Sequence, residues 1–165
     1  MNLEKFKNTT ILVTGATGLI GSHIVTKLLA IEGTRVIASG PSIVAMAQDY
    51  LKSGKSTKFR EMAGDGEITP YIVAKAAEAG DPVAKRIFTI IGEYVGMGLV
   101  SVINLLNPEK VIIGGGVAEA GDLLLEPIRK TVMERAMVVA RESVEIVPAE
   151  LGNSAGVIGA SMLVE

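Results

Sequence analysis

The sequence predicts an α/β fold of three layers, with a mostly parallel four-stranded sheet and helices on both of its faces, similar to a Rossmann fold. Short apolar runs alternate with longer stretches of helical periodicity, as in βαβ units. Glycine is abundant, at 19 of 165 residues, and it clusters where strands would turn into helices. Apolar residues make up 48% of the chain, so a single domain over residues 1–165 can bury a core.

The first βαβ unit is expected within residues 11–38. Residues 11–14 form a short apolar run that ends at Gly15, as a buried strand would. Residues 19–31 repeat apolar side chains at helical spacing, and residues 35–38 form a second short strand. A strand, a helix and a strand over this length predict two parallel strands joined by a right-handed crossover.

Helices are expected to fill the middle of the chain, over residues 42–52, 69–80 and 81–106. Ser42, Thr69 and Asp81 can each cap a helix, because their side-chain oxygens accept hydrogen bonds from the first backbone N–H groups. Proline follows the last two of these residues and suits the first helical position. Glycines at 92, 96 and 98 would weaken the third helix unless a neighbouring element packs closely against them.

The intervening segment 53–67 contains several glycines and is expected to be a mobile loop. Toward the C-terminus we expect a strand, a helix, a strand and a closing helix, over residues 111–113, 121–138, 144–147 and about 153–164. Pro127 lies inside the first of these helices and should start it or kink it. We expect the strand order 2-1-3-4, which places the ends of strands 1 and 3 side by side where ligands bind in such sheets.

A glycine-rich segment follows the first expected strand and has the spacing of a dinucleotide loop. Gly15 permits a tight turn, Gly18 lets a pyrophosphate approach the backbone, and Gly21 permits close contact between helix and strand. The segment resembles the opening of extended short-chain dehydrogenases and epimerases over about residues 1–39. That resemblance implies an NAD(P) site at Gly15, Thr17, Gly18, Leu19, Ile20 and Gly21.

Two features depart from the dehydrogenase pattern. Ser39 and Gly40 stand where that family often has a charged residue that reads the ribose. A Tyr-x-x-x-Lys pattern occurs at Tyr71 and Lys75, but too early in the chain for that family's catalytic pair. We therefore interpret Tyr71 and Lys75 as two residues on one helix face.

A second glycine run, Gly114, Gly115 and Gly116, follows the strand expected at 111–113. From Ser39 through residues 40–165 the chain contains, in order, the segments SGP at 39–41, AEAGDP at 77–82, NLLNP at 104–108, VIIGGGV at 111–117 and LGNSAG at 151–156. This series resembles the C-terminal part of ROK-family glucokinases, which have an actin-like fold. The resemblance implies that Gly114, Gly115 and Gly116 contribute to an ATP or ADP site near the adenosine. The alternative for each glycine loop is a plain turn between a strand and a helix.

Neither resemblance supplies a complete catalytic set. The ROK family's catalytic aspartate, its sugar-binding residues and its zinc site belong to sequence that this chain lacks, and phosphoryl transfer needs metal, base and phosphate clamp together. We interpret the carboxylates in the kinase-like part as helix caps and solvated surface; they are Asp65, Glu67, Asp81, Asp122 and Glu126. His23 is interpreted as a structural or surface residue.

We expect the chain to be an engineered chimera of two α/β fragments. We expect it to have no catalytic activity and to require no cofactor. The first alternative is weak binding of NAD(P), ATP or ADP at the glycine loops, and the second is a fragment of a glucokinase-type sugar kinase. The net charge of −2 does not indicate a nucleic-acid-binding surface. The sequence shows no membrane segment, targeting signal or cysteine. A cytoplasmic monomer or weak homodimer is expected.

Overall fold

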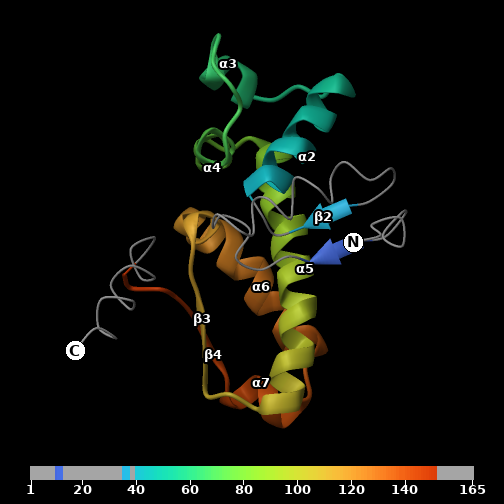
Figure 1. The fold of residues 1–165 in the computed structure, drawn as a ribbon, viewed down its shortest axis with the longest axis vertical. Coiled ribbons are helices and arrows are strands. Elements are labelled where there is room, and N and C mark those ends of the chain that lie inside the picture. Colours follow the sequence, from blue (N-terminus) through green and yellow to red (C-terminus); the bar gives the residue numbers. More distant parts are fainter. Residues whose placement is uncertain (1–9, 13–34, 38–39, 152–165) are drawn as a thin grey trace, which may run out of the picture.

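The computed structural model describes residues 10–12, 35–37 and 40–151 (Figure 1). The described elements are, in order, β1 (Thr10–Leu12), β2 (Arg35–Ile37), α2 (Gly40–Lys52), α3 (Phe59–Ala63), α4 (Pro70–Glu78), α5 (Pro82–Leu106), β3 (Lys110–Ile113), the short 3₁₀ helix η2 (Gly116–Ala120), α6 (Asp122–Arg135), α7 (Val138–Ser143) and β4 (Glu145–Pro148). Helix α5 runs along the long axis of the molecule. Helices α2, α3 and α4 gather around its N-terminal end, and α6 and α7 lie along the rest of it (Figure 1).

Helix α5 begins and ends where the sequence predicts, because both ends carry local capping residues. At its start, Oδ1 of Asp81 accepts hydrogen bonds from the backbone N–H groups of Val83 at 2.8 Å and Ala84 at 2.9 Å. At its end, Asn107 adopts the left-handed conformation, with φ of 45°. Pro108 follows and cannot continue the helix.

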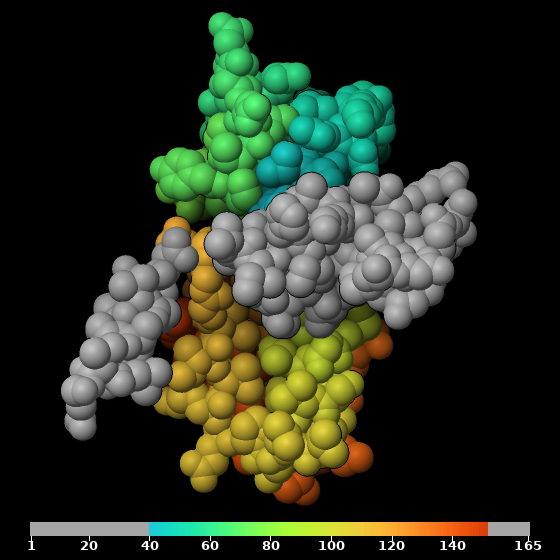
Figure 2. Space-filling model, viewed as in Figure 1, coloured from blue at the N-terminus to red at the C-terminus, as the bar shows by residue number. Residues whose placement is uncertain are grey.

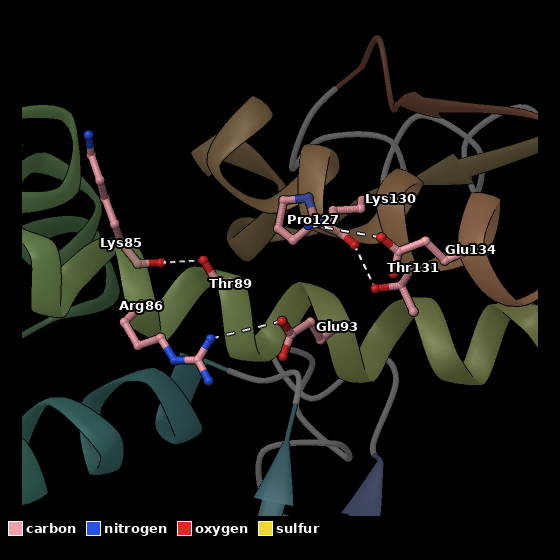
Figure 3. A network of polar contacts seen from close by, with 8 residues as sticks. All are labelled: Lys85, Arg86, Thr89, Glu93, Pro127, Lys130, Thr131 and Glu134. Atoms are coloured by element: carbon pink, nitrogen blue, oxygen red, sulfur yellow. Dashed lines mark hydrogen bonds and ion pairs between the residues drawn. The ribbon is translucent and has the colours of Figure 1, made fainter.

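Helices α5 and α6 approach each other closely at two glycines of α5 (Figure 3). A Cβ atom added at Gly92 would lie 2.6 Å from Cγ of Pro127, and one added at Gly96 would lie 2.6 Å from Cβ of Thr131. Figure 3 shows Pro127 and Thr131 on the side of α6 that faces α5. The expectation that these glycines mark a close neighbour is therefore confirmed at Gly92 and Gly96.

The segment expected to be a mobile loop contains a helix, α3, and is anchored in the core. Phe59 opens α3 and is 0% exposed. Just before it, the hydroxyl of Thr57 and the backbone N–H of Lys58 both donate to Oδ2 of Asp81. The buried ring and the two hydrogen bonds hold this segment against the start of α5, and the loop prediction is wrong for residues 59–63, which form α3.

The helix expected over 121–138 is divided in the structure. Helix α6 runs through Pro127 and ends at Arg135, and the backbone at Ala136 is extended, with φ of −76° and ψ of 158°. The backbone N–H of Met137 then donates to Oδ1 of Asn104 on α5, at 2.9 Å. This bond to a distant part of the chain favours the break, after which α7 begins.

Two parallel strand pairs are described. Strands β1 and β2 pair from Thr10 opposite Arg35, and β3 pairs with β4 from Lys110 opposite Glu145. Helices α6 and α7 form the crossover between β3 and β4, as a βαβ unit requires. Within the described residues these pairs are two separate sheets, so the single sheet of order 2-1-3-4 stays a prediction. The closing helix expected at 153–164 lies outside the described residues.

Helix α5 is, among the described helices, the one long and apolar enough to cross a membrane by length and composition. A core helix of a soluble protein meets the same test. Ile87, Phe88 and Ile91 of α5 are buried, and the helix packs along α6. These contacts place one side of α5 in the core, although only 22% of its most apolar window is buried by the rest of the molecule.

A substitution in the core between α5 and α6 tests how tightly these two helices pack. Ile128 of α6 is 0% exposed and belongs to the main apolar cluster. Ile128→Val removes one buried methylene, and we expect it to lower the free energy of unfolding by about 1 kcal/mol. The measurement is the midpoint of urea unfolding. An unchanged midpoint would show that α6 packs less tightly on α5 than these positions indicate.

Candidate functional site

The glycine run after β3 makes a sharp turn. Gly115 has φ of 91°, a conformation that side chains with a Cβ rarely adopt. A Cβ added at Gly114 would lie 3.3 Å from Cβ of Ala149, just after β4. These two glycines therefore serve the turn itself. Gly116 opens η2, and a Cβ added there would meet no atom within 4 Å.

Gly116 faces a cavity of about 200 Å³ between η2 and α4. Figure 2 shows a notch between the green atoms of the α4 region and the orange atoms below them. The residues that line the cavity are Ile43, Pro70, Tyr71, Ala74, Lys75, Glu78, Phe88, Gly116, Val117, Glu119 and Ala120. They come from α2, α4, α5 and η2.

The floor of this η2–α4 cavity is apolar and fixed by the core. Ile43 of α2 is 0% exposed and Phe88 of α5 is 1% exposed. Ala74 and Val117 line the walls. Helix α4 is capped at its start, where the Thr69 hydroxyl accepts a hydrogen bond from the backbone N–H of Ile72 at 3.3 Å. An apolar lining with a few polar groups at the rim occurs in small-molecule sites, but those usually have volumes of about 300 to 1,000 Å³, so a cavity of about 200 Å³ is small for one.

The polar rim consists mainly of side chains on one face of α4. Nζ of Lys75 lies 2.7 Å from Oε2 of Glu78 and 5.7 Å from the centre of the Tyr71 ring. The hydrogen bond and the negative charge of Glu78 raise the pKa of Lys75 above its ordinary value. The interpretation of Tyr71 and Lys75 as neighbours on one helix face is confirmed. Glu119 of η2 adds a second carboxylate to the rim.

The other glycine-rich segment follows β1 and lies outside the described residues. Its predicted site residues are Gly15, Thr17, Gly18, Leu19, Ile20 and Gly21. Whether this segment lies beside the run at 114–116 stays a prediction.

Of the three glycines predicted to contribute to a nucleotide site, Gly116 lines this cavity, and the sequence analysis did not place the residues of α4 there. The available signal was the spacing of Tyr71, Ala74, Lys75 and Glu78, which places them on one side of a helix. Nothing in that spacing indicates that this side faces η2.

The carboxylates that we interpreted as helix caps or surface groups lie at a helix cap or on the surface. Asp81 is the buried cap of α5, and Asp65, Glu67, Asp122 and Glu126 are exposed. Within the part of the chain that the structure describes, no cluster of three His, Cys, Asp or Glu side chains could hold a metal ion.

Comparison with known proteins gives matches to one family. The model of the ROK family matches residues 34–165. The chain is 36% identical over 130 residues to a glucokinase of Halalkalibacterium halodurans, covering 78% of this chain and 39% of that protein. It is 28% identical over 127 residues to the xylose repressor of Caldicellulosiruptor bescii, covering 77% of this chain and 32% of the repressor.

A solved structure agrees with these matches. A ROK family glucokinase from Streptomyces griseus, crystallised in complex with glucose and AMPPNP, superposes with a TM-score of 0.69 at 30% identity. The superposition covers 76% of this chain and 42% of that glucokinase. The chain thus spans less than half the length of the relatives it matches. The family match begins at residue 34 and leaves out the segment 15–21.

Proposed function

Because the chain belongs to the ROK family, we propose that it carries the nucleoside-binding part of a ROK-type sugar kinase, with the η2–α4 cavity as its binding site. The observation that carries the proposal is the position of Gly116, the last residue of the glycine run, in the wall of this cavity. A purine is flat and apolar on its faces, which suits the partly buried apolar side chains of Ala74 and Val117 in the cavity wall.

The relatives leave a second assignment within the same family. One relative is named a glucokinase and another a xylose repressor. The higher identity to the glucokinase, 36% against 28%, favours the kinase assignment. Sugar phosphorylation by the whole protein, with glucose as substrate, is part of this proposal.

A thermal-shift titration with ATP, ADP, NAD⁺ and NADP⁺ tests the proposed site. A ligand at about ten times its Kd stabilises the folded state by about 1.4 kcal/mol. For a chain of this length that raises Tm by about 3 to 6 °C. We expect a saturable rise with ADP and ATP. Ala74→Leu, which places a larger side chain in the cavity wall, should abolish it.

The matched control is Ala79→Leu, an exposed position at the end of the same helix. It should keep the nucleotide-dependent rise. A cooperative melt with no shift by any nucleotide would overturn the proposal and favour a folded chain whose glycine run is a turn only.

The dehydrogenase-like nature of residues 1–39 and a chimeric, engineered origin stay hypotheses. Their support in the structure is the parallel pairing of β1 with β2, since parallel neighbours need a crossover such as residues 13–34 can provide. The named relatives are sugar kinases and repressors, and they lend no support to a dehydrogenase part. A rise in Tm with NAD⁺ that is lost in Gly18→Val would favour a dehydrogenase-like part.

A further inference from the structure

We propose that Arg129 blocks the outer edge of β4 and so keeps a second copy of the chain from pairing its own β4 there. The inference concerns the β3–β4 sheet and does not depend on the proposed nucleotide site. It follows from the register of β4, from three features that block its outer edge, and from the open space beside that edge.

Alternate residues of a strand direct their backbone N–H and C=O groups to opposite sides. Glu145 and Ala149 donate their backbone N–H groups to the β3 side of the sheet, each at 2.9 Å. The residues that alternate with them, Val144, Ile146 and Pro148, therefore direct their backbone groups away from β3. An edge of this kind can pair with a strand of another molecule unless something prevents it.

Each of these three residues has one backbone group that cannot pair with another strand. The backbone N–H of Val144 donates to the backbone oxygen of Ala140 in α7, at 3.2 Å. Pro148 has no backbone N–H. The carbonyl oxygen of Ile146 accepts a hydrogen bond from Nε of Arg129 on α6, at 3.0 Å. The last of these blocks is a side chain that reaches the edge from a neighbouring helix.

Ile146 is the residue at which the side chain of Arg129 matters most. Without the bond from Arg129, Ile146 would offer both a donor and an acceptor to the outer side of β4. Two copies related by a twofold axis at this residue could then exchange two N–H to C=O bonds, as directly opposite residues do in an antiparallel pair. The edge is thus self-complementary, so the partner that fits it is a second copy of the chain.

The space beside this edge is open. A cavity of about 370 Å³ lies along β4 and is lined by residues 144–147, together with residues of α6 and α7 that include Arg129. Nη1 of Arg129 also lies 3.3 Å from Oδ1 of Asp122, and the two side chains are 41% and 75% exposed. A pair this exposed contributes little to stability, so Arg129 can be replaced without disturbing the core.

The test removes the two blocks that substitution can lift. Arg129→Ala frees the oxygen of Ile146, and Pro148→Val restores a backbone N–H at the next outward-facing residue. With both changes, two copies can form four hydrogen bonds across a twofold axis instead of two. Sedimentation equilibrium measures the self-association constant relative to the unmodified chain. We expect it to rise about tenfold in the double variant and less than about threefold in each single variant.

The control is Arg141→Ala combined with Pro148→Val. Arg141 lines the same cavity, but its Nη1 donates to the backbone oxygen of Met133 in α6, at 2.8 Å. This pair of changes should keep the association constant of Pro148→Val alone. Equal association in the Arg141 and Arg129 double variants would overturn the inference. A folded Arg129 double variant that associates no more than the unmodified chain would overturn it as well.

Hydrogen exchange in the unmodified chain tests the block without any substitution. By NMR, the Nε–H of Arg129 should exchange with water severalfold more slowly than the Nε–H of Arg60, an exposed residue of α3. Equal exchange rates for the two arginines would overturn the inference, even if the double variant fails to fold.

Discussion

Replacing Asp81 with alanine is expected to lower the free energy of unfolding by about 3 kcal/mol. Asp81 is 1% exposed and its two carboxylate oxygens accept four hydrogen bonds. Two of these cap α5, and loss of such a cap costs about 1 kcal/mol. The other two donors are the Thr57 hydroxyl and the backbone N–H of Lys58. Both of these bonds are partly buried, and each donor left without its acceptor adds about 1 kcal/mol.

Urea unfolding measures this effect, and Asp49→Ala is the matched control. Asp49 lies in α2; its side chain is 80% exposed, and its Oδ1 atom is 4.0 Å from Nζ of Lys52. Removal of an exposed carboxylate of this kind should change stability by less than about 0.5 kcal/mol. Equal midpoints for the two variants would show that Asp81 does not hold the segment 57–63 against α5.

The same carboxylate should make stability depend on pH. Burial alone would raise the pKa of Asp81, but hydrogen bonds from the backbone of Ala84 and Lys58, the Thr57 hydroxyl and the backbone of Val83 outweigh it. The pKa in the folded state is therefore below its ordinary value. Stability from this group is fully present above the ordinary aspartate pKa, near 4, and is lost as the pH falls through the folded pKa.

Asp81→Asn isolates this pH dependence, because asparagine keeps one oxygen for capping and does not titrate. The difference in unfolding free energy between the unmodified chain and Asp81→Asn should be constant near neutral pH and shrink below about pH 4. Urea unfolding from pH 7 to pH 3 measures it. A difference that widens toward acid pH would contradict the assignment.

The parts of the fold that the sequence predicted best are those set by local interactions. The starts of α4 and α5 agree with expectation because Thr69 and Asp81 cap them within three residues. Helix α7 was missed because the break before it depends on Asn104, which is distant in the sequence. Helix α3 was missed because Phe59 is stabilised by burial in the core.

The nucleotide site predicted at the glycine run stays a prediction, and its sequence signal was local. The glycine run after β3 is a local signal, and Gly116 does reach the cavity. The opposite wall depends on how α4 packs against η2, and the spacing of Lys75 and Glu78 contains no information about that contact. From sequence alone, a lysine and a glutamate on one helix face predict a solvent-exposed surface. The element that packs near that face, here η2, is known only from the structure.

Gly92→Leu is expected to be the second strongly destabilising change, lowering the free energy of unfolding by about 3 kcal/mol. Even a Cβ atom at this position would lie 2.6 Å from Cγ of Pro127 and 2.9 Å from the backbone oxygen of Leu124. The backbone oxygen cannot move unless α6 moves as a whole. Overpacking of this kind in a well-packed core typically costs 1 to 3 kcal/mol, roughly at its upper end for a side chain as large as leucine.

The control is Ser101→Leu, which adds the same side chain to an exposed position of α5. It should change the urea midpoint only slightly, since surface substitutions in helices usually have small effects.

A double-mutant cycle with Gly92→Ala and Pro127→Ala then isolates the contact between position 92 of α5 and Pro127 of α6. Removing the proline ring should relieve part of the clash, giving a favourable coupling of about 1 kcal/mol. Additive effects would mean that α5 and α6 do not meet at Gly92, and the packing of the whole helical core would need revision.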